Sequence, residues 1–95
     1  MGKFDVVVTK TAERDLKVMN PSLRLKILQA VRTLSLSPFP RGNIIKKLTG
    51  TKIALYRLRM ADYRIVYHID GHQCVILFIT ARKDLEKRLK GFGSG

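Results

Sequence analysis

This chain has few of the residues on which several large classes of protein depend. A single cysteine, Cys74, has no partner for an internal disulfide, which predicts a cytoplasmic protein kept in a reducing compartment. The two histidines, His68 and His72, stand outside any spacing typical of metal ligands. No glycine-rich phosphate loop precedes a helical pattern, and no serine lies in a nucleophile elbow. We therefore expect no metal, and neither a P-loop enzyme nor a serine hydrolase.

Long hydrophobic runs are also missing. Lys3 and Asp5 interrupt the valine-rich N-terminus, so we expect no signal peptide, and no stretch is long enough to span a membrane. The 95 residues, of which 45% are hydrophobic, predict one domain over 1–91 and a flexible C-terminal tail over 92–95. A domain of this size has little room for a deep cavity, so we expect no small-molecule cofactor.

Acidic residues are scarce beside basic ones. Seven Asp and Glu against nineteen Lys and Arg give a formal charge of +12. Such an excess lowers folding stability through self-repulsion and favours association with polyanions. Both a nucleic acid and an acidic protein partner would match this charge.

The hydrophobic pattern predicts an α+β domain of order β-α-α-β-β-β with a short basic helix at its end. Threonines cap the first helix, Asn20-Pro21 starts the second, and Pro38 and Pro40 open a loop after it. The last strand is apolar on both faces, so we expect it inside the sheet or covered on both sides. The expected elements are a strand at 4–9, helices at about 12–20 and 21–36, strands at about 52–60, 62–70 and 73–81, and a helix ending near Gly91.

Arginines recur in the first two strands of the predicted hairpin region. Alternation places Arg57 and Arg59 on one face, and it places Arg64 and His68 together on one face of the next strand. If the strands pair across 60–62, the aromatic and aliphatic rows face the core and the arginine rows gather on the other side. Asp62 is the only acid in this stretch. Because arginine binds phosphate in a bidentate manner and keeps its charge, we interpret this side as a phosphate-binding face.

Other polar groups near these strands have simpler explanations. Tyr56, Tyr63 and Tyr67 fall on the core side, which favours packing over a catalytic phenol. Lys46 and Lys47 fit either a solvated turn or an extension of the arginine face.

RNA cleavage needs no metal when the RNA supplies its own nucleophile. The 2′-hydroxyl can attack the adjacent phosphate and leave a 2′,3′-cyclic phosphate and a free 5′-hydroxyl. The protein then needs to orient the strand, stabilise the charged transition state and help to move protons. A face of arginines could supply most of this.

Four segments carry a recognisable order and separation: Lys47-Leu48-Thr49-Gly50, Leu55-Tyr56-Arg57-Leu58-Arg59, Asp62-Tyr63-Arg64-Ile65-Val66-Tyr67 and Arg82-Lys83-Asp84. Together they resemble the RelE-like messenger RNA interferases in the RelE/ParE toxin superfamily. The resemblance covers nearly everything from Lys3 to Lys90. It implies a helical hairpin packed on a twisted, mainly antiparallel sheet, with a basic concave surface that engages messenger RNA in the ribosomal A site.

The resemblance also implies roles for the basic residues. Arg64 and Arg82 would contact the scissile phosphate, and Arg57 would both stabilise the reacting groups and hold RNA. The remaining cations would grip the RNA backbone. They are Lys46, Lys47, Arg59 and Lys83.

The chain departs from the family at the position of a base or stacking group. Many relatives carry a His-Arg pair followed four residues later by a tyrosine, whereas here Ala81 precedes Arg82 and Glu86 stands at the tyrosine position. Glu86 could accept the proton of the 2′-hydroxyl, or it could pair with Lys90 one helical turn later. His68 is either a second candidate base or an exposed strand histidine.

The function implied by the resemblance is that of a type II toxin: a metal-independent endoribonuclease that inhibits translation. Its implied partners are a cognate antitoxin that covers the basic face, the ribosome and messenger RNA. Two alternatives stay open. A toxin of the ParE type would act on DNA gyrase without cutting RNA, and a degenerate relative would bind RNA but not cleave it.

Overall fold

The computed structural model describes residues 3–93, which form three α-helices and a five-stranded sheet. The sheet order is β1-β5-β4-β3-β2; β1 and β5 run parallel, and every other neighbouring pair is antiparallel. This confirms the predicted α+β class with a mainly antiparallel sheet. The elements are β1 (Asp5–Val8), α1 (Lys10–Lys17), α2 (Pro21–Thr33), β2 (Ile45–Lys47), β3 (Tyr56–Met60), β4 (Tyr63–Asp70), β5 (Gln73–Ala81), the 3-10 turn η1 (Arg82–Asp84) and α3 (Leu85–Gly93).

The strand β2 is an addition to the predicted order. It forms because Ile45 pairs with Leu58 of β3 and is fully buried, while the next two residues of the strand are exposed. The strand predicted from residue 52 begins only at Tyr56. Before it, residues 48–55 form a loop that is closed by a hydrogen bond of 2.8 Å from the Leu48 N–H to the Leu55 carbonyl.

The C-terminal helix is longer than expected. α3 continues to Gly93, so Phe92, which the sequence placed in a flexible tail, belongs to the helix. Its ring lies 6.1 Å from the ring of Phe78 between centroids. The rest of the expected tail, residues 94–95, lies outside the described residues.

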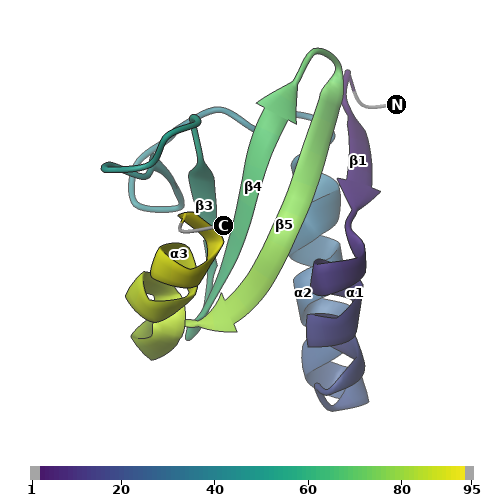
Figure 1. Cartoon of the computed structure of the whole chain (residues 1–95). Helices are drawn as coiled ribbons and strands as arrows, with labels where there is room; N and C mark the ends of the chain where they lie inside the picture. Colours follow the sequence, from purple (N-terminus) through teal and green to yellow (C-terminus); the bar gives the residue numbers. More distant parts are fainter. Residues whose placement is uncertain (1–2, 94–95) are drawn as a thin grey trace.

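The helices cover opposite faces of the sheet, with the hairpin of α1 and α2 on one side and α3 on the other (Figure 1). Side chains cap both helices of the hairpin, because Thr9 accepts from the Ala12 N–H and Asn20 accepts from the Leu23 N–H. Such caps are each worth about 1 kcal/mol. Arg24 of α2 donates to the carbonyls of Leu16 and Met19, at 3.0 and 2.9 Å, and so fixes the end of α1 against α2. Within residues 3–93, no helix is both long and apolar enough to cross a membrane.

Two hydrophobic cores result from this arrangement. The larger one lies between the sheet and the helical hairpin, and it includes Leu58, Ile65 and Tyr67, as strand alternation predicted. The smaller one lies on the other face, where Val66 and Phe78 pack under α3. β5 is therefore covered on both sides, which explains why its sequence is apolar on both faces.

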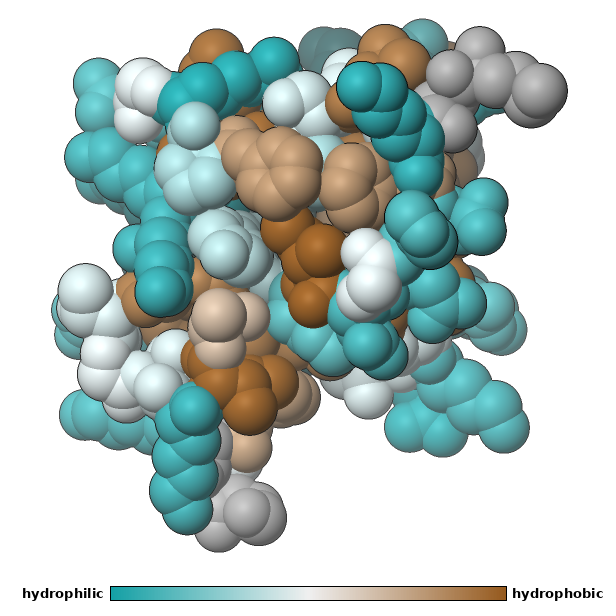
Figure 2. Space-filling view, turned by 90° about the horizontal axis from the view of Figure 1, so that it is seen from above, coloured by the Kyte–Doolittle hydropathy of each residue, from teal (hydrophilic) through white to brown (hydrophobic). Residues whose placement is uncertain are grey.

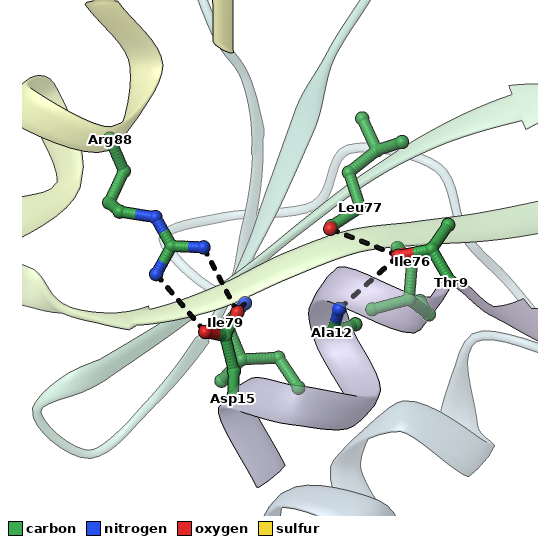
Figure 3. A network of polar contacts seen from close by, with 7 residues as sticks. All are labelled: Thr9, Ala12, Asp15, Ile76, Leu77, Ile79 and Arg88. Atoms are coloured by element: carbon green, nitrogen blue, oxygen red, sulfur yellow. Dashed lines mark hydrogen bonds and ion pairs between the residues drawn. The ribbon is translucent and has the colours of Figure 1, made fainter. Parts of the chain in front are cut away.

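The edge of β5 continues beyond the end of β1, and α1 satisfies its polar groups (Figure 3). The Thr9 hydroxyl lies 2.8 and 3.1 Å from the carbonyl oxygens of Ile76 and Leu77. Further along, the Asp15 carboxylate accepts from the Ile79 N–H at 2.9 Å. The same carboxylate forms an ion pair of 3.1 Å with Arg88, which reaches around β5 from α3. Asp15 thus links the two helical layers through the strand that separates them.

Replacing Asp15 tests this link. We expect Asp15→Ala to lower the free energy of unfolding by about 1–3 kcal/mol, because it leaves the Ile79 N–H and the Arg88 guanidinium without their acceptor. Asp15→Asn should cost less, since the amide oxygen can still accept from Ile79. The control is Glu13→Ala on the same helix, at an exposed position, which should change stability by about 0.5 kcal/mol or less. Urea denaturation measures all three, and equal stability of the two Ala variants would contradict the proposed link.

Candidate nucleic-acid interface

The register of the central hairpin places the arginines on one face. β3 and β4 pair with Arg59 opposite Arg64 and Arg57 opposite Val66, which gathers the arginine rows on one face as predicted. On the other side of β3, Lys46 of β2 is the partner of Arg57. We call Arg57, Arg59, Arg64 and Arg82 the arginine cluster, because the last of these joins the other three from the end of β5.

Arg64 is the central and most buried member of the arginine cluster. Its side chain lies in the sheet face with 7% of the residue exposed, although arginine is seldom buried without an acidic partner. The Nη1 atom donates instead to the main-chain carbonyls of Ala61 and Tyr63, at 3.1 and 2.9 Å. Burial lowers the pKa of Arg64, and repulsion from the other three arginines lowers it further. The three other members are therefore close enough to act on Arg64.

Arg82 approaches from the end of β5, at the start of η1. Its main-chain N–H donates to the Asp62 carbonyl at 2.7 Å, which joins the end of β5 to the turn between β3 and β4. A shallow hollow lies at this corner and is lined by Asp62, Tyr63, Ala81, Arg82 and Lys83. The side chains of Arg82 and Lys83 are exposed beside it.

The charge of the arginine cluster is not neutralised within residues 3–93. The ion pair found in this part of the chain joins Arg88 to Asp15, away from the cluster, and none involves a cluster arginine. Arg57 donates to the Asn43 carbonyl at 3.1 Å, so it too is held by the main chain rather than by a carboxylate. Asp62 favours the charged form of Arg64 without forming an ion pair with it. The cluster arginines can therefore still form charge-assisted hydrogen bonds with an anion.

The two lysines of β2 lie on opposite faces of the sheet. Lys46 lies beside Arg57 on the arginine face, whereas Lys47 pairs with Tyr56 and therefore belongs to the opposite face. Both side chains are exposed. Of the two, only Lys46 extends the arginine face as the sequence analysis allowed.

The candidate bases lie at different distances from the arginines. His68 shares the face of Arg64, but it is four residues further along β4, roughly 13 Å at the spacing of a strand, with the second core between them. Glu86 follows Arg82 by four residues through η1 and the first turn of α3, and its side chain is exposed. Among the described residues it forms no ion pair with Lys90, the alternative that the sequence left open.

The aromatic residues of the hairpin are structural, as predicted. Tyr67 is fully buried, and its hydroxyl donates to the Pro38 carbonyl at 2.7 Å. Its ring stacks on that of Tyr56 with 5.7 Å between centroids.

The buried Cys74 thiol has its pKa raised by burial to about 12, so it stays protonated at neutral pH. Residues 3–93 contain no group of three His, Cys, Asp or Glu side chains placed to hold a metal ion.

Sequence reasoning missed two residues near the cluster. Thr80 is the register partner of Arg64 on β5 and is 5% exposed, so it is a polar residue in a strand that was taken as apolar. Ala61 holds Arg64 through its carbonyl and has a φ of 52°, which no feature of an alanine in a sequence would indicate. Alternation along β5 could have found Thr80 once the register with β4 was known.

The sequence and fold match known toxins. A family model, the ParE toxin of type II toxin-antitoxin system, parDE, matches residues 6–87. The toxin RelE1 of Methanocaldococcus jannaschii is 32% identical over 88 residues, which cover 90% of this chain and 97% of that protein.

Solved structures show the same relationship. A chain of the RelE-RelB complex from Pyrococcus horikoshii OT3 matches with a TM-score of 0.71 and 27% identity, covering 84% of this chain and 96% of that one. A chain of the toxin-antitoxin complex RelBE2 from Mycobacterium tuberculosis matches with a TM-score of 0.71 and 28% identity, covering 84% of this chain and 99% of that one. The chain belongs to the RelE/ParE superfamily of toxins from type II toxin–antitoxin systems, as its motifs predicted, and within that superfamily it is RelE-like.

Crowding of like charges gives a first test of the interface. Because Arg59 lies directly opposite Arg64, Arg59→Gln should raise the free energy of unfolding by about 0.5 kcal/mol or less at low salt. The gain should shrink between about 0.01 M and about 1 M salt, where the screening length becomes short. Lys26→Gln, at an exposed position on α2, is the control and should show no comparable gain. Thermal or urea unfolding at both salt concentrations checks this, and a loss of stability in Arg59→Gln would contradict the repulsion.

Proposed function

We propose that this toxin is a ribosome-dependent endoribonuclease that cleaves messenger RNA and so inhibits translation. The observation that carries the proposal is the arginine cluster, four neighbouring arginines that form no ion pair within residues 3–93. A structural role would ordinarily pair such groups, since unpaired like charges lower stability. A phosphodiester in the cluster would supply the missing negative charge.

The arrangement supports attack by the 2′-hydroxyl of the RNA. In that step the 2′-oxygen forms a bond to the adjacent phosphorus while the bond from phosphorus to the 5′-oxygen breaks. The base removes the proton of the 2′-hydroxyl, and a proton is delivered to the departing 5′-oxygen. Negative charge increases on the phosphoryl oxygens in the transition state, where Arg64 and Arg82 would stabilise it. Arg64 is suited to this because hydrogen bonds already fix its guanidinium, so little reorganisation is needed.

The remaining cations have supporting roles in this proposal. Arg57 lies between Lys46 and Val66 in the register and would contact both the reacting group and the RNA backbone. Arg59, Lys46 and Lys83 would hold backbone phosphates, since all three side chains are exposed. Arg59 lies opposite Arg64, Lys46 lies beside Arg57, and Lys83 follows Arg82. Lys47 lies on the opposite face, and any contact with RNA would have to come from the edge of β2.

Glu86 is the preferred proton acceptor. It follows Arg82 by four residues, through η1 and the first turn of α3, and its side chain is exposed. A carboxylate there could reach a 2′-hydroxyl whose phosphate is bound by Arg82. His68 is the second candidate, but its separation from Arg64 along β4 requires a different part of the RNA to reach it.

An antitoxin partner is part of the proposal. The similar chains come from the RelE-RelB complex of P. horikoshii and from the toxin-antitoxin complex RelBE2 of M. tuberculosis. The surface here exposes large apolar side chains, including Phe39 and Phe92 at 51% and 43%, and hydrophobic residues gather within a hydrophilic rim in the view from above (Figure 2). A partner with apolar and acidic groups would cover these residues and offset the charge of +12.

Inhibition of DNA gyrase is the second candidate function. The matching family model is that of the ParE toxins, and Glu86 replaces the tyrosine that many interferases carry. A toxin of that kind would not need the arginine cluster for catalysis. Its activity would therefore survive substitutions that abolish RNA cleavage.

Cleavage on translating ribosomes tests the leading proposal. Purified toxin should produce cuts within the A-site codon, mapped by primer extension. We expect Arg82→Ala and Arg64→Ala each to reduce the single-turnover rate by about 100-fold or more, the effect of removing one preorganised donor. Arg82→Ala should fold normally because the side chain is exposed. The folding of Arg64→Ala must be checked by circular dichroism because its side chain is buried.

The matched control is Arg32→Ala, which removes an exposed arginine from the helical hairpin on the far side of the sheet. It should cleave at the wild-type rate. If all these proteins cut equally, the arginine cluster is not the active site. If wild-type toxin cuts nothing but inhibits purified gyrase, the second function is correct.

The proton acceptor can be tested in the same assay. Glu86→Gln should lower the cleavage rate by about 100-fold, the scale of general base catalysis, because the amide cannot accept the proton. His68→Gln should retain most of the activity. Both side chains are at least partly exposed, so neither change should affect folding. The reverse order of effects would assign the role to His68.

A further inference from the structure

The turn between β3 and β4 has an unusual backbone. Ala61 and Asp62 connect Met60 to its register partner Tyr63 as a two-residue hairpin loop. Ala61 has a φ of 52°, and it is the non-glycine residue with positive φ in residues 3–93. Glycine or asparagine usually takes this conformation, because the Cβ of other residues meets the backbone. The hairpin turn between β4 and β5 follows that rule with Gly71, whose φ is 60°.

Three consecutive carbonyls of this segment accept hydrogen bonds from the two arginines assigned to the phosphate. Arg64 Nη1 donates to Ala61 at 3.1 Å and to Tyr63 at 2.9 Å. The Asp62 carbonyl between them accepts from the main-chain N–H of Arg82 at 2.7 Å. One turn therefore holds the guanidinium of one arginine and the backbone of the other.

We propose that the Ala61–Asp62 turn is a positioning element that sets the placement of Arg64 relative to Arg82. This rests on the proposed ribonuclease function. Ala61 touches no reacting atom and acts through the direction of its carbonyl. The positive φ turns that carbonyl towards the Arg64 guanidinium, and a return to negative φ would rotate the peptide and remove the contact.

The choice of alanine supports a positioning role. Glycine would adopt the same φ without strain, but it would also let the turn sample other conformations. Alanine allows the turn fewer conformations than glycine would. The surrounding hydrogen bonds hold Ala61 at a positive φ that is unfavourable for an isolated alanine. Backbone strain that persists in this way is concentrated at functional sites.

The test compares substitutions at position 61 in the full toxin on translating ribosomes. Ala61→Val should lower kcat by about tenfold to a hundredfold, the cost of misplacing a catalytic group by about 1 Å, while KM changes much less. A β-branched residue resists positive φ, so the turn must rearrange. Ala61→Asn should keep kcat near that of wild type, because asparagine tolerates this conformation. This rescue separates backbone conformation from side-chain size.

The turn at Gly71 supplies the matched control, since it lies at the other end of β4 and contacts no cluster arginine. A comparison of Gly71→Val with Gly71→Ala reproduces the change from alanine to valine at a similar φ. Gly71→Val should be less stable than Gly71→Ala in urea denaturation, and the two variants should have the same kcat. A folded Ala61→Val protein with wild-type kcat, or an equal loss of kcat at position 71, would overturn the positioning role.

A second measurement does not depend on catalysis. In wild-type toxin, the guanidinium protons of Arg64 should exchange with water at least about tenfold more slowly than those of Arg59 in NMR spectra. Arg64 donates to two carbonyls, whereas the Arg59 side chain donates to none within residues 3–93. If wild type does not cut RNA, but Arg64 is protected and a folded Ala61→Val protein loses that protection, the ribonuclease function fails while the turn still positions the arginine. Equal exchange of Arg64 and Arg59 would overturn the positioning role even where Ala61→Val does not fold.

Discussion

The interface depends on a buried arginine that is held by main-chain dipoles rather than by a carboxylate. Carbonyl oxygens accept hydrogen bonds from Nη1 of Arg64 but carry no full negative charge, so they do not neutralise the guanidinium. A salt bridge would have fixed the side chain equally well and would have cancelled that charge. Burial lowers the pKa of Arg64, and repulsion from the surrounding arginines lowers it further. Repulsion among these arginines lowers stability, and a bound anion would relieve it.

The rest of the fold keeps this strained face in place. The helical hairpin packs on the opposite side of the sheet, and α3 covers the part of the arginine face that is apolar. Asp15 connects both layers through the edge of β5, with one carboxylate serving a strand N–H and the Arg88 guanidinium. Arg88 also lies over the Phe78 ring, with its Cζ atom 4.7 Å from the centroid, and so adds a cation–π contact to the ion pair. Arg88 thus has a structural role and an acidic partner, whereas the cluster arginines form no ion pair within residues 3–93.

Much of this organisation could be predicted from the residues. The alternation of Arg57, Leu58 and Arg59 gave the two faces of β3 correctly, and the apolar run in β5 indicated cover on both sides. Features that depend on tertiary contacts could not be predicted. β2 is three residues long, too short for a periodic signal, and the shift of register between Val66 and Tyr67 depends on packing against β5. For the same reason, nothing in the sequence showed that Lys46 and Lys47 would lie on different faces, or that Ala61 would adopt positive φ. The roles of the cluster residues rest on the family resemblance and on their geometry.

The parallel pairing of β1 with β5 joins the first strand of the chain to the last, with Asp5 beside Gln73. During synthesis, β1 must therefore wait for β5 to leave the ribosomal exit tunnel before it finds its neighbour. Arg82 and the carbonyl that anchors it also meet only at that stage, because β5 must first align with β4. The cationic face consequently forms on a nascent chain only after every strand of the sheet has emerged.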